Sequence, residues 1–188
     1  TLTLAAVGQA NSLGANKALV IDGVVPTVTN VTSTTSNGTL KLGESAAITV
    51  TFSEAVTVNG TPQLTLETGS SDAVVDYTSG SGGTTLTFNY TVASGHVSSD
   101  LDYASTSALA LNGGTINDAN GNAATLTLAA LGQANSLGAN KALVIDGVVP
   151  TVTNVTSTTS DGTLKIGDVA AITVTFSETV TVTGTLQI

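Results

Sequence analysis

Apolar and polar residues alternate along several short stretches of the chain. Ile48, Val50 and Phe52 are separated by threonines, and every second residue from Leu86 to Val92 is also apolar. A period of two predicts β-strands that bury one face and expose the other. The same period predicts strands around three further pairs of leucines, namely Leu64 and Leu66, Leu109 and Leu111, and Leu126 and Leu128.

Turn-forming residues separate these stretches, and no segment shows a convincing helical period. The turn signals are Asn37-Gly38, Asn59-Gly60, residues 80–83, residues 112–114 and Asn120-Gly121. An Ala-rich stretch, residues 4–19, recurs at 128–143, but its internal glycines favour a loop or a single helical turn. Short strands at this spacing predict an all-β fold, an Ig-like antiparallel β-sandwich.

The chain contains a long internal repeat. Residues 125–188 restate residues 1–64 with nine differences, at an offset of 124 residues. A repeat of this length indicates a tandem array of whole domains rather than a solenoid. If copies join at the Asp-Gly-Val-Val-Pro segment, the chain has three parts, which suggests a window from a longer array. These parts are the C-terminal part of a preceding repeat (1–24), one complete repeat (25–148) and the N-terminal part of the following repeat (149–188).

The composition excludes several classes of function. The 188 residues include 13 acids, four lysines and no arginine, for a formal net charge of −9. Nucleic acids and anionic membrane surfaces need clustered basic residues, so neither is expected as a partner. The absence of cysteine excludes disulfides, zinc ribbons and thiol catalysis. No apolar run approaches the roughly 18 residues of a membrane span, so membrane insertion is not expected.

The order of motifs along the unit resembles a known group of repeats. These motifs are VIDGVVPTVTNVTST, ITVTFSEAVTV, GTPQLTLETG, LTFNYTV, SSDLDYAST, ALALNGGTINDANGNAATLTL and NKALVID. They resemble the extender repeats of giant bacterial surface adhesins and swimming-associated cell-surface proteins. The resemblance implies calcium-stiffened Ig-like modules in tandem, in a secreted protein at the bacterial surface or in the extracellular matrix. It implies a structural spacer, and it does not imply a catalytic activity.

Two groups of acidic residues within the unit are candidate calcium ligands. A strand would direct Asp100 and Asp102 to the same face, so the pair marks either a calcium site or a solvated edge. Asp118 begins a Asp-Ala-Asn-Gly-Asn segment that starts like a calcium loop. It lacks the glutamate at the twelfth position of an EF-hand, so a plain hairpin turn is the alternative.

Further candidates lie where one copy joins the next. Asp22 and its repeat counterpart Asp146 precede Gly-Val-Val-Pro, while Glu54 ends a strand and recurs as Glu178. The resemblance implies that the glutamate of the Phe-Ser-Glu element faces the junction between modules. Asp22 in the linker could then share a calcium ion with the loops that hold Glu54 and Asp118, which would restrict the hinge. The predicted calcium ligands are therefore Asp22, Glu54, Asp100, Asp102, Asp118, Asp146 and Glu178.

The remaining chemistry-bearing residues favour structural roles. His96 is the only histidine, and with no second His or Cys a structural contact is favoured over a metal site. Tyr77, Tyr90 and Tyr103 are expected to pack in the core or on a sheet face. No pairing of a nucleophile with a base is evident, so the sequence predicts that the protein is not an enzyme.

Two alternatives to the spacer remain open. In a self-assembling filament, residues 1–24 and 149–188 of neighbouring chains would complete each other by strand addition. The partners would then be other copies of the same repeat in a homopolymeric assembly. A carbohydrate-binding module or glycosidase would use Asp100 and Asp102 as paired carboxylates, but the chain has no Trp to form a sugar platform.

Overall fold

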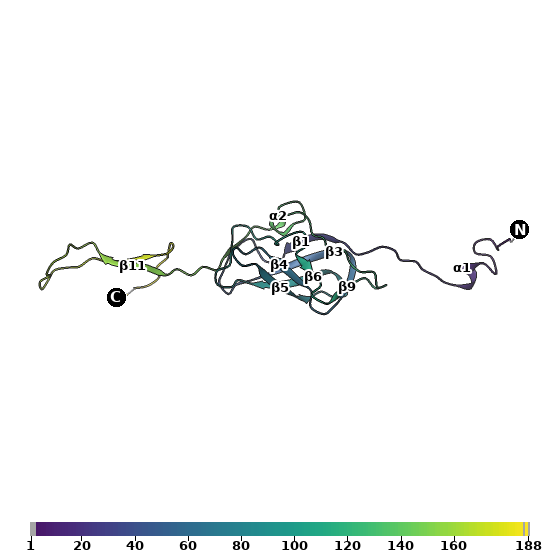
Figure 1. The fold of residues 1–188 in the computed structure, drawn as a ribbon, viewed down its shortest axis with the longest axis horizontal. Helices are drawn as coiled ribbons and strands as arrows, with labels where there is room; N and C mark the ends of the chain where they lie inside the picture. Colours follow the sequence, from purple (N-terminus) through teal and green to yellow (C-terminus); the bar gives the residue numbers. More distant parts are fainter. Residues whose placement is uncertain (1–2, 186, 188) are drawn as a thin grey trace.

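A central β-sandwich lies between two extended arms in the computed structural model (Figure 1). The structure describes residues 3–185 and 187. The N-terminal arm enters the sandwich at one end of the long axis, and the C-terminal arm leaves it at the other end (Figure 1). None of the helices in the described ranges is long and apolar enough to cross a membrane.

Among the described residues, strands outnumber helices, and each of the two helices is a single turn. In chain order the elements are α1 (Leu13–Asn16), β1 (Val28–Ser33), β2 (Gly38–Lys41), β3 (Ser45–Asn59), β4 (Gln63–Leu66), β5 (Ala73–Ser79), β6 (Gly83–Thr91), β7 (Val97–Ser98), β8 (Leu109–Ala110), β9 (Thr115–Asn117), α2 (Leu137–Asn140), β10 (Leu143–Asp146), β11 (Val152–Ser157) and β12 (Ile172–Phe176).

Two sheets form the sandwich. The larger has the order β1-β3-β6-β5-β4-β8, with β9 also paired to β3, and the smaller has the order β2-β10-β7. All strand pairs are antiparallel except β10 with β2. That pair is parallel, so β2 and β10 run in the same direction within the smaller sheet. The expected all-β, Ig-like antiparallel sandwich is confirmed.

The alternating residues form the core between the sheets. The ladder of β3 with β6 places Ile48 opposite Phe88 and Val50 opposite Leu86, and all four side chains are fully buried. Tyr90 and Tyr103 are buried as expected, while Tyr77 packs edge-on against Phe88 with ring centroids 6.2 Å apart. The period of two therefore identified the core faces of the long strands.

The prediction of a strand around Leu126 and Leu128 is wrong. This segment makes only an isolated bridge, between Thr125 and Thr27. Its backbone N–H groups donate to two separate segments, from Thr125 to Pro26 O (2.8 Å) and from Leu128 to Thr106 O (2.9 Å). Because these acceptors do not belong to one neighbouring strand, no ladder can form, although Leu128 is still buried.

Each Ala-rich stretch forms a single helical turn, as the glycines suggested. Ser12 caps α1 by accepting the Ala15 N–H (3.3 Å), and Ser136 caps α2 by accepting the Ala139 N–H (3.2 Å). The α2 turn packs against β1, and its Leu137 is fully buried. The turns themselves are therefore local structures that form with or without a packing partner.

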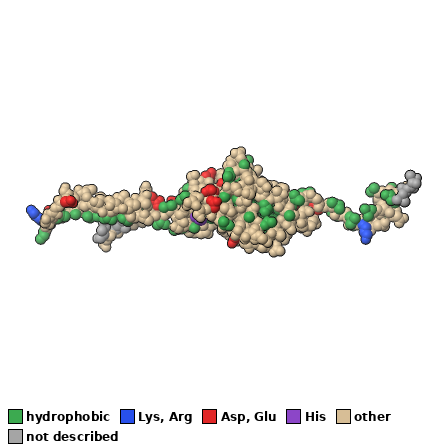
Figure 2. All heavy atoms as spheres, viewed as in Figure 1, with side chains coloured by type: hydrophobic (Ala, Val, Ile, Leu, Met, Phe, Trp, Pro, Cys, Tyr) green, Lys and Arg blue, Asp and Glu red, His purple; other side chains and the backbone are tan. Residues whose placement is uncertain are grey.

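The two arms expose apolar side chains whose repeat counterparts are buried in the sandwich. β11 pairs with β12 in the same register as β1 with β3, including the same register shift. Ile172 in this hairpin is 48% exposed, whereas its counterpart Ile48 is 0% exposed. Figure 2 shows hydrophobic side chains on the surface of both arms.

Candidate metal centre

Three of the predicted ligands meet where the N-terminal arm enters the sandwich. Asp22, Glu54 and Asp118 each offer a carboxylate oxygen, and these oxygens lie within 4.8 Å of one another. Asp22 precedes β1, Glu54 lies in β3, and Asp118 follows β9 directly. Among the residues that the structure describes, this is the one such group of three or more His, Cys, Asp or Glu side chains.

The loop after β9 is folded around the Asp118 carboxylate. Its Oδ1 accepts the backbone N–H groups of Asn120 (2.9 Å) and Asn122 (2.8 Å), and its Oδ2 accepts the Asn122 amide (2.7 Å). Gly121 completes the turn with a φ of +92°, in the left-handed region that favours glycine. The Asp-x-Asn-x-Asn spacing thus forms a hairpin turn that fixes one carboxylate in place.

These contacts hold Asp118 in its ionised form. Burial on its own would raise the pKa of the carboxyl, but hydrogen bonds from the Asn122 side chain and from three backbone N–H groups outweigh it. The pKa of Asp118 is therefore lowered below its ordinary value. A carboxylate that stays charged in a buried position is suited to bind a cation.

The linker is attached to this loop by two asparagine side chains. The Asn120 amide donates to Asp22 Oδ2 (2.6 Å), and the Asn122 amide donates to the Asp22 carbonyl (3.4 Å). Asp22 Oδ1 also accepts the backbone N–H of Val24 (3.1 Å). From the sequence, these asparagines were expected in a calcium loop or a hairpin turn, and their contact with the linker was not expected. They position Asp22 beside the other two carboxylates.

Glu54 completes the group from a break in the β3 ladder. The pairing of β3 with β6 shifts register between Thr51 and Val56, and Glu54 lies within that irregular stretch. Its Oε1 is buried and has no hydrogen-bond partner among the described residues. A buried carboxylate oxygen without a partner is unfavourable, and a cation at this position would satisfy it.

The next junction repeats part of this arrangement. Asp146 and Glu178 line one groove of about 490 Å³ where the C-terminal arm leaves the sandwich. Asp146 Oδ1 accepts the Val148 N–H (3.3 Å), as Asp22 Oδ1 accepts that of Val24. Glu178 Oε1 is also buried, and no hydrogen-bond partner for it lies in the part of the chain that the structure describes. The counterpart of Asp118 would lie 124 residues later and is not part of this sequence, so only two of the three carboxylates are present.

Asp100 and Asp102 lie apart from the group of three. The expected alternation is present, since Leu101 is fully buried between two more exposed carboxylates, although residues 100–102 form no strand. Asp102 accepts the backbone N–H groups of Tyr103 (2.9 Å) and Gly132 (3.2 Å). Its contacts therefore serve to hold the loop before α2 against the sandwich. No third acidic side chain joins the pair within the described residues.

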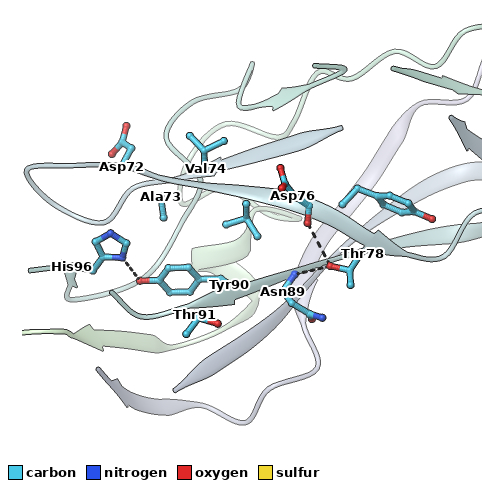
Figure 3. A pocket seen from close by; sticks show the side chains of 11 residues that line it. Asp72, Ala73, Val74, Asp76, Thr78, Asn89, Tyr90, Thr91 and His96 are labelled. Carbon is cyan, nitrogen blue, oxygen red and sulfur yellow. Dashed lines mark hydrogen bonds between the residues drawn. The ribbon is translucent and has the colours of Figure 1, made fainter. Parts of the chain in front are cut away.

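His96 and Tyr90 lie at a groove of about 620 Å³ beside β5 and β6 (Figure 3). The Tyr90 hydroxyl and His96 Nδ1 are 3.0 Å apart, and the two rings stack with centroids separated by 5.9 Å. Because Tyr90 is buried, it offers no free ring face to a sugar. Asp76 at the same groove accepts the Gln63 amide (2.8 Å). These contacts are structural ones.

The comparisons with known proteins agree with the fold. A family model described as a bacterial Ig-like domain matches residues 22–130, which is more than half of the chain. No curated protein and no solved structure matched the chain. The matched range begins at Asp22 and includes Glu54 and Asp118, so all three clustered carboxylates lie within it. This chain belongs to the family of bacterial Ig-like domains.

Proposed function

We propose that this chain is a structural spacer of a bacterial surface protein, in which calcium bound at each junction holds successive repeats at a fixed angle. Domains of this family occur in surface proteins. The internal repeat supports a tandem arrangement. The observation that carries the proposal is the convergence of Asp22, Glu54 and Asp118 at the entry to the sandwich.

The type of ligand favours calcium over other metals. The group offers only carboxylate oxygens, and the neighbouring polar side chains are the amides of Asn120 and Asn122. Calcium takes about six to eight oxygen ligands, whereas zinc and copper sites use imidazole or thiolate groups. Carbonyl oxygens and water would complete the set. The unpartnered Glu54 Oε1 is the atom whose environment fits an ion best.

The position of the ligands explains how an ion would stiffen the array. Asp22 belongs to the linker, whereas Glu54 and Asp118 belong to the sandwich. Without a cation, three carboxylates at this separation repel one another, and the linker depends on the Asn120 and Asn122 amides for attachment. A bound cation would attract all three carboxylates and outweigh their mutual repulsion. It would thereby join the linker to the sandwich. The freedom of the hinge would then fall.

Thermal unfolding in millimolar calcium and in excess chelator tests this proposal. A ligand that binds only the folded state stabilises it by about 2.7 kcal/mol at roughly 100 times its Kd. For a repeat of this size, that gain corresponds to a rise in Tm of about 10 °C. Magnesium should give a smaller rise, because it dehydrates reluctantly and demands a tighter octahedral shell.

Glu54→Gln is the most informative variant for the site. It keeps the shape of the side chain and removes one charge, so it should abolish most of the calcium-dependent shift. It should also raise the Tm in chelator above that of the unmodified chain, because it relieves the repulsion among the three carboxylates. Asp72→Asn, a change at an exposed acid outside the group, is the matched control. If both variants keep the full calcium shift, the proposed site is wrong.

A filament is a second candidate function, and the exposure of both arms favours it. Ile21 is 89% exposed and Val155 is 58% exposed, although their counterparts Ile145 and Val31 are buried in the sandwich. Exposed apolar surface of this kind marks a site of association. Strand addition between neighbouring chains would cover it.

A further inference from the structure

We infer that residues 12–22 of one chain dock on residues 154–165 of a second copy, with residues 19–22 adding as a parallel strand to residues 162–165. The inference rests on the second candidate function and supplies its contacts and register. The two surfaces are exposed in the 188-residue chain. In a longer array, the next repeat of the same chain would cover them through the same contacts.

The sandwich itself provides the template for this contact. There, α2 and β10 close the fold by packing on β1 and β2. The Ala142 carbonyl accepts the Gly38 N–H (3.0 Å), and the Asn140 amide donates to the Val31 carbonyl (2.8 Å). β10 then pairs with β2 from Leu143 opposite Gly38 to Asp146 opposite Lys41. This closing segment therefore binds through backbone contacts that depend on a fixed register.

Both halves of the template recur in the arms with almost no change. Residues 12–22 are identical to 136–146, and residues 154–165 differ from 30–41 only at position 161, which is Asp in place of Asn37. Asn37 Oδ1 accepts the backbone N–H of Ala142 (3.3 Å), and a carboxylate oxygen of Asp161 can accept the same bond. Every side chain used in the template is thus either present in the arms or replaced by an equivalent acceptor.

The exposed apolar residues of the arms are the ones that this contact would bury. Ile145 is 2% exposed where it packs in β10, whereas Ile21 is 89% exposed. On the receiving side, Val31 is 0% exposed and Val155 is 58% exposed. Removal of such surface from water favours association.

Neither arm forms the counterparts of the strands β10 and β2, which pair with each other in the sandwich. Residues 143–146 and 38–41 are strands in the sandwich, but residues 19–22 and 162–165 have no strand structure. Each segment would provide the other with the neighbour that it has in the ladder of β10 with β2. Backbone groups without a partner at the edge of an incomplete fold are a template for strand addition.

The geometry makes this contact intermolecular and open-ended. The arms extend from opposite ends of the sandwich, so residues 12–22 cannot reach residues 154–165 of their own chain (Figure 1). A head-to-tail contact between different surfaces repeats from chain to chain and gives rings or fibres. The joint would still lack the counterparts of residues 65–124. It is therefore weaker than a complete repeat, and association should depend on concentration.

Light scattering of the 188-residue chain over a range of concentrations is the first test. We expect the mean mass to rise by at least about twofold with concentration. Ile21→Asp should prevent this rise, because it would bury a charge at the joint while leaving the sandwich untouched. Val7→Asp is the matched control, since Val7 is 98% exposed and its counterpart Leu131 is also largely exposed, at 48%. A monomer at every concentration overturns both the filament and the register.

Disulfide trapping tests the register separately. The chain has no cysteine, and Val144 lies opposite Thr39 in the ladder of β10 with β2. The double variant Val20→Cys/Thr163→Cys should therefore form covalent oligomers under mild oxidation. The pair Val20→Cys/Thr39→Cys is the control, and it would cross-link only if the arm displaced β10 from a sandwich. Association with cross-linking in the control pair alone, or in neither pair, overturns the register and leaves the filament standing.

Discussion

Residues 3–24 and residues 127–148 have almost the same sequence, but only the second segment is packed in a sandwich. Leu137 is 0% exposed in α2, whereas Leu13 is 69% exposed in α1. Both segments form the same four-residue helical turn with the same serine cap. The strand that follows the turn exists only as β10, and residues 19–22 remain irregular. The turn is thus determined locally, and the strand requires its partners.

The opening strands give a similar comparison with a different outcome. β11 and β12 pair in the arm as β1 and β3 do in the sandwich, with the same shift after the first residue pair. Their faces are nevertheless exposed, since Val155 is 58% exposed and Val31 is 0% exposed. A register that is set by the two strands themselves survives the loss of the remaining core. Burial requires the whole repeat.

The strongest test of this comparison makes the same substitution, Leu to Ala, at Leu137 in the sandwich and at its counterpart Leu13 in the arm. Leu137→Ala should destabilise the sandwich by about 2–5 kcal/mol, because it leaves a cavity at a fully buried site. At a low protein concentration, where the arm is undocked, Leu13→Ala should leave the urea midpoint unchanged within error, because its side chain is outside the core. Equal effects at the two positions would contradict the contrast between the segments. The measurement is urea unfolding of each variant by circular dichroism.

Gly147 and Gly23 provide a second pair, with a smaller expected effect. A Cβ at Gly147 would collide with the Ala93 carbonyl oxygen, whereas a Cβ at Gly23 would meet nothing within 4 Å. Gly147→Ala should therefore cost about 1–3 kcal/mol of stability, and Gly23→Ala should cost none. Thermal unfolding of the two variants at one protein concentration gives the comparison. A tolerated Gly147→Ala would mean that the exit of the sandwich is held less tightly than its contacts indicate.

The sequence predicted the fold class and the location of the site better than it predicted individual strands. Alternation identified the faces of β3 and β6 because both strands are long and buried on one side. It failed at Leu126 and Leu128, where the backbone binds two separate segments and no ladder forms. A period of two records burial on alternate sides and does not record a hydrogen-bonded neighbour.

The candidate site shows the same limit. Asp22, Glu54 and Asp118 were expected to share a junction, and the structure brings them together. The distances among them, and the attachment of Asp22 by Asn120 and Asn122, depend on where the loop after β9 lies in space. Asp100 and Asp102 looked equally suitable in the sequence, but among the described residues no third acidic side chain joins them. Whether calcium binds at any of these residues stays a prediction.

Alkaline unfolding should report on the sandwich alone, because neither arm contains a tyrosine. Burial raises the pKa of Tyr90 to about 12, and burial with the nearby Asp102 charge raises that of Tyr103 to about 12. The unfolded chain loses these protons near pH 10 and the folded chain does not, so stability is present below about pH 10 and falls as the pH rises toward 12. At about pH 11 we expect a loss of about 1 kcal/mol for each tyrosine.

Urea midpoints at about pH 8 and pH 11 provide the measurement, and Tyr90→Phe should show a smaller loss of stability between the two pH values. A midpoint that does not change with pH would contradict the buried, protonated state of both hydroxyls.

The two serine caps give the smallest expected effect and separate local from global structure. Ser136 and Ser12 each accept an N–H bond from the third residue of the following turn, so Ser→Ala removes the same bond at each position. Ser136→Ala should lower the stability of the sandwich by about 1 kcal/mol, because α2 packs on β1 and its loss is felt by the whole fold. With the arm undocked, Ser12→Ala should leave the Tm unchanged and only reduce the population of α1, which amide chemical shifts of residues 13–16 would detect.

If Ser12→Ala lowered the Tm as much as Ser136→Ala does, the N-terminal arm would have to be packed in solution, as the inferred head-to-tail contact requires. The same pair of variants measured at low and high protein concentration therefore distinguishes a free arm from a docked one.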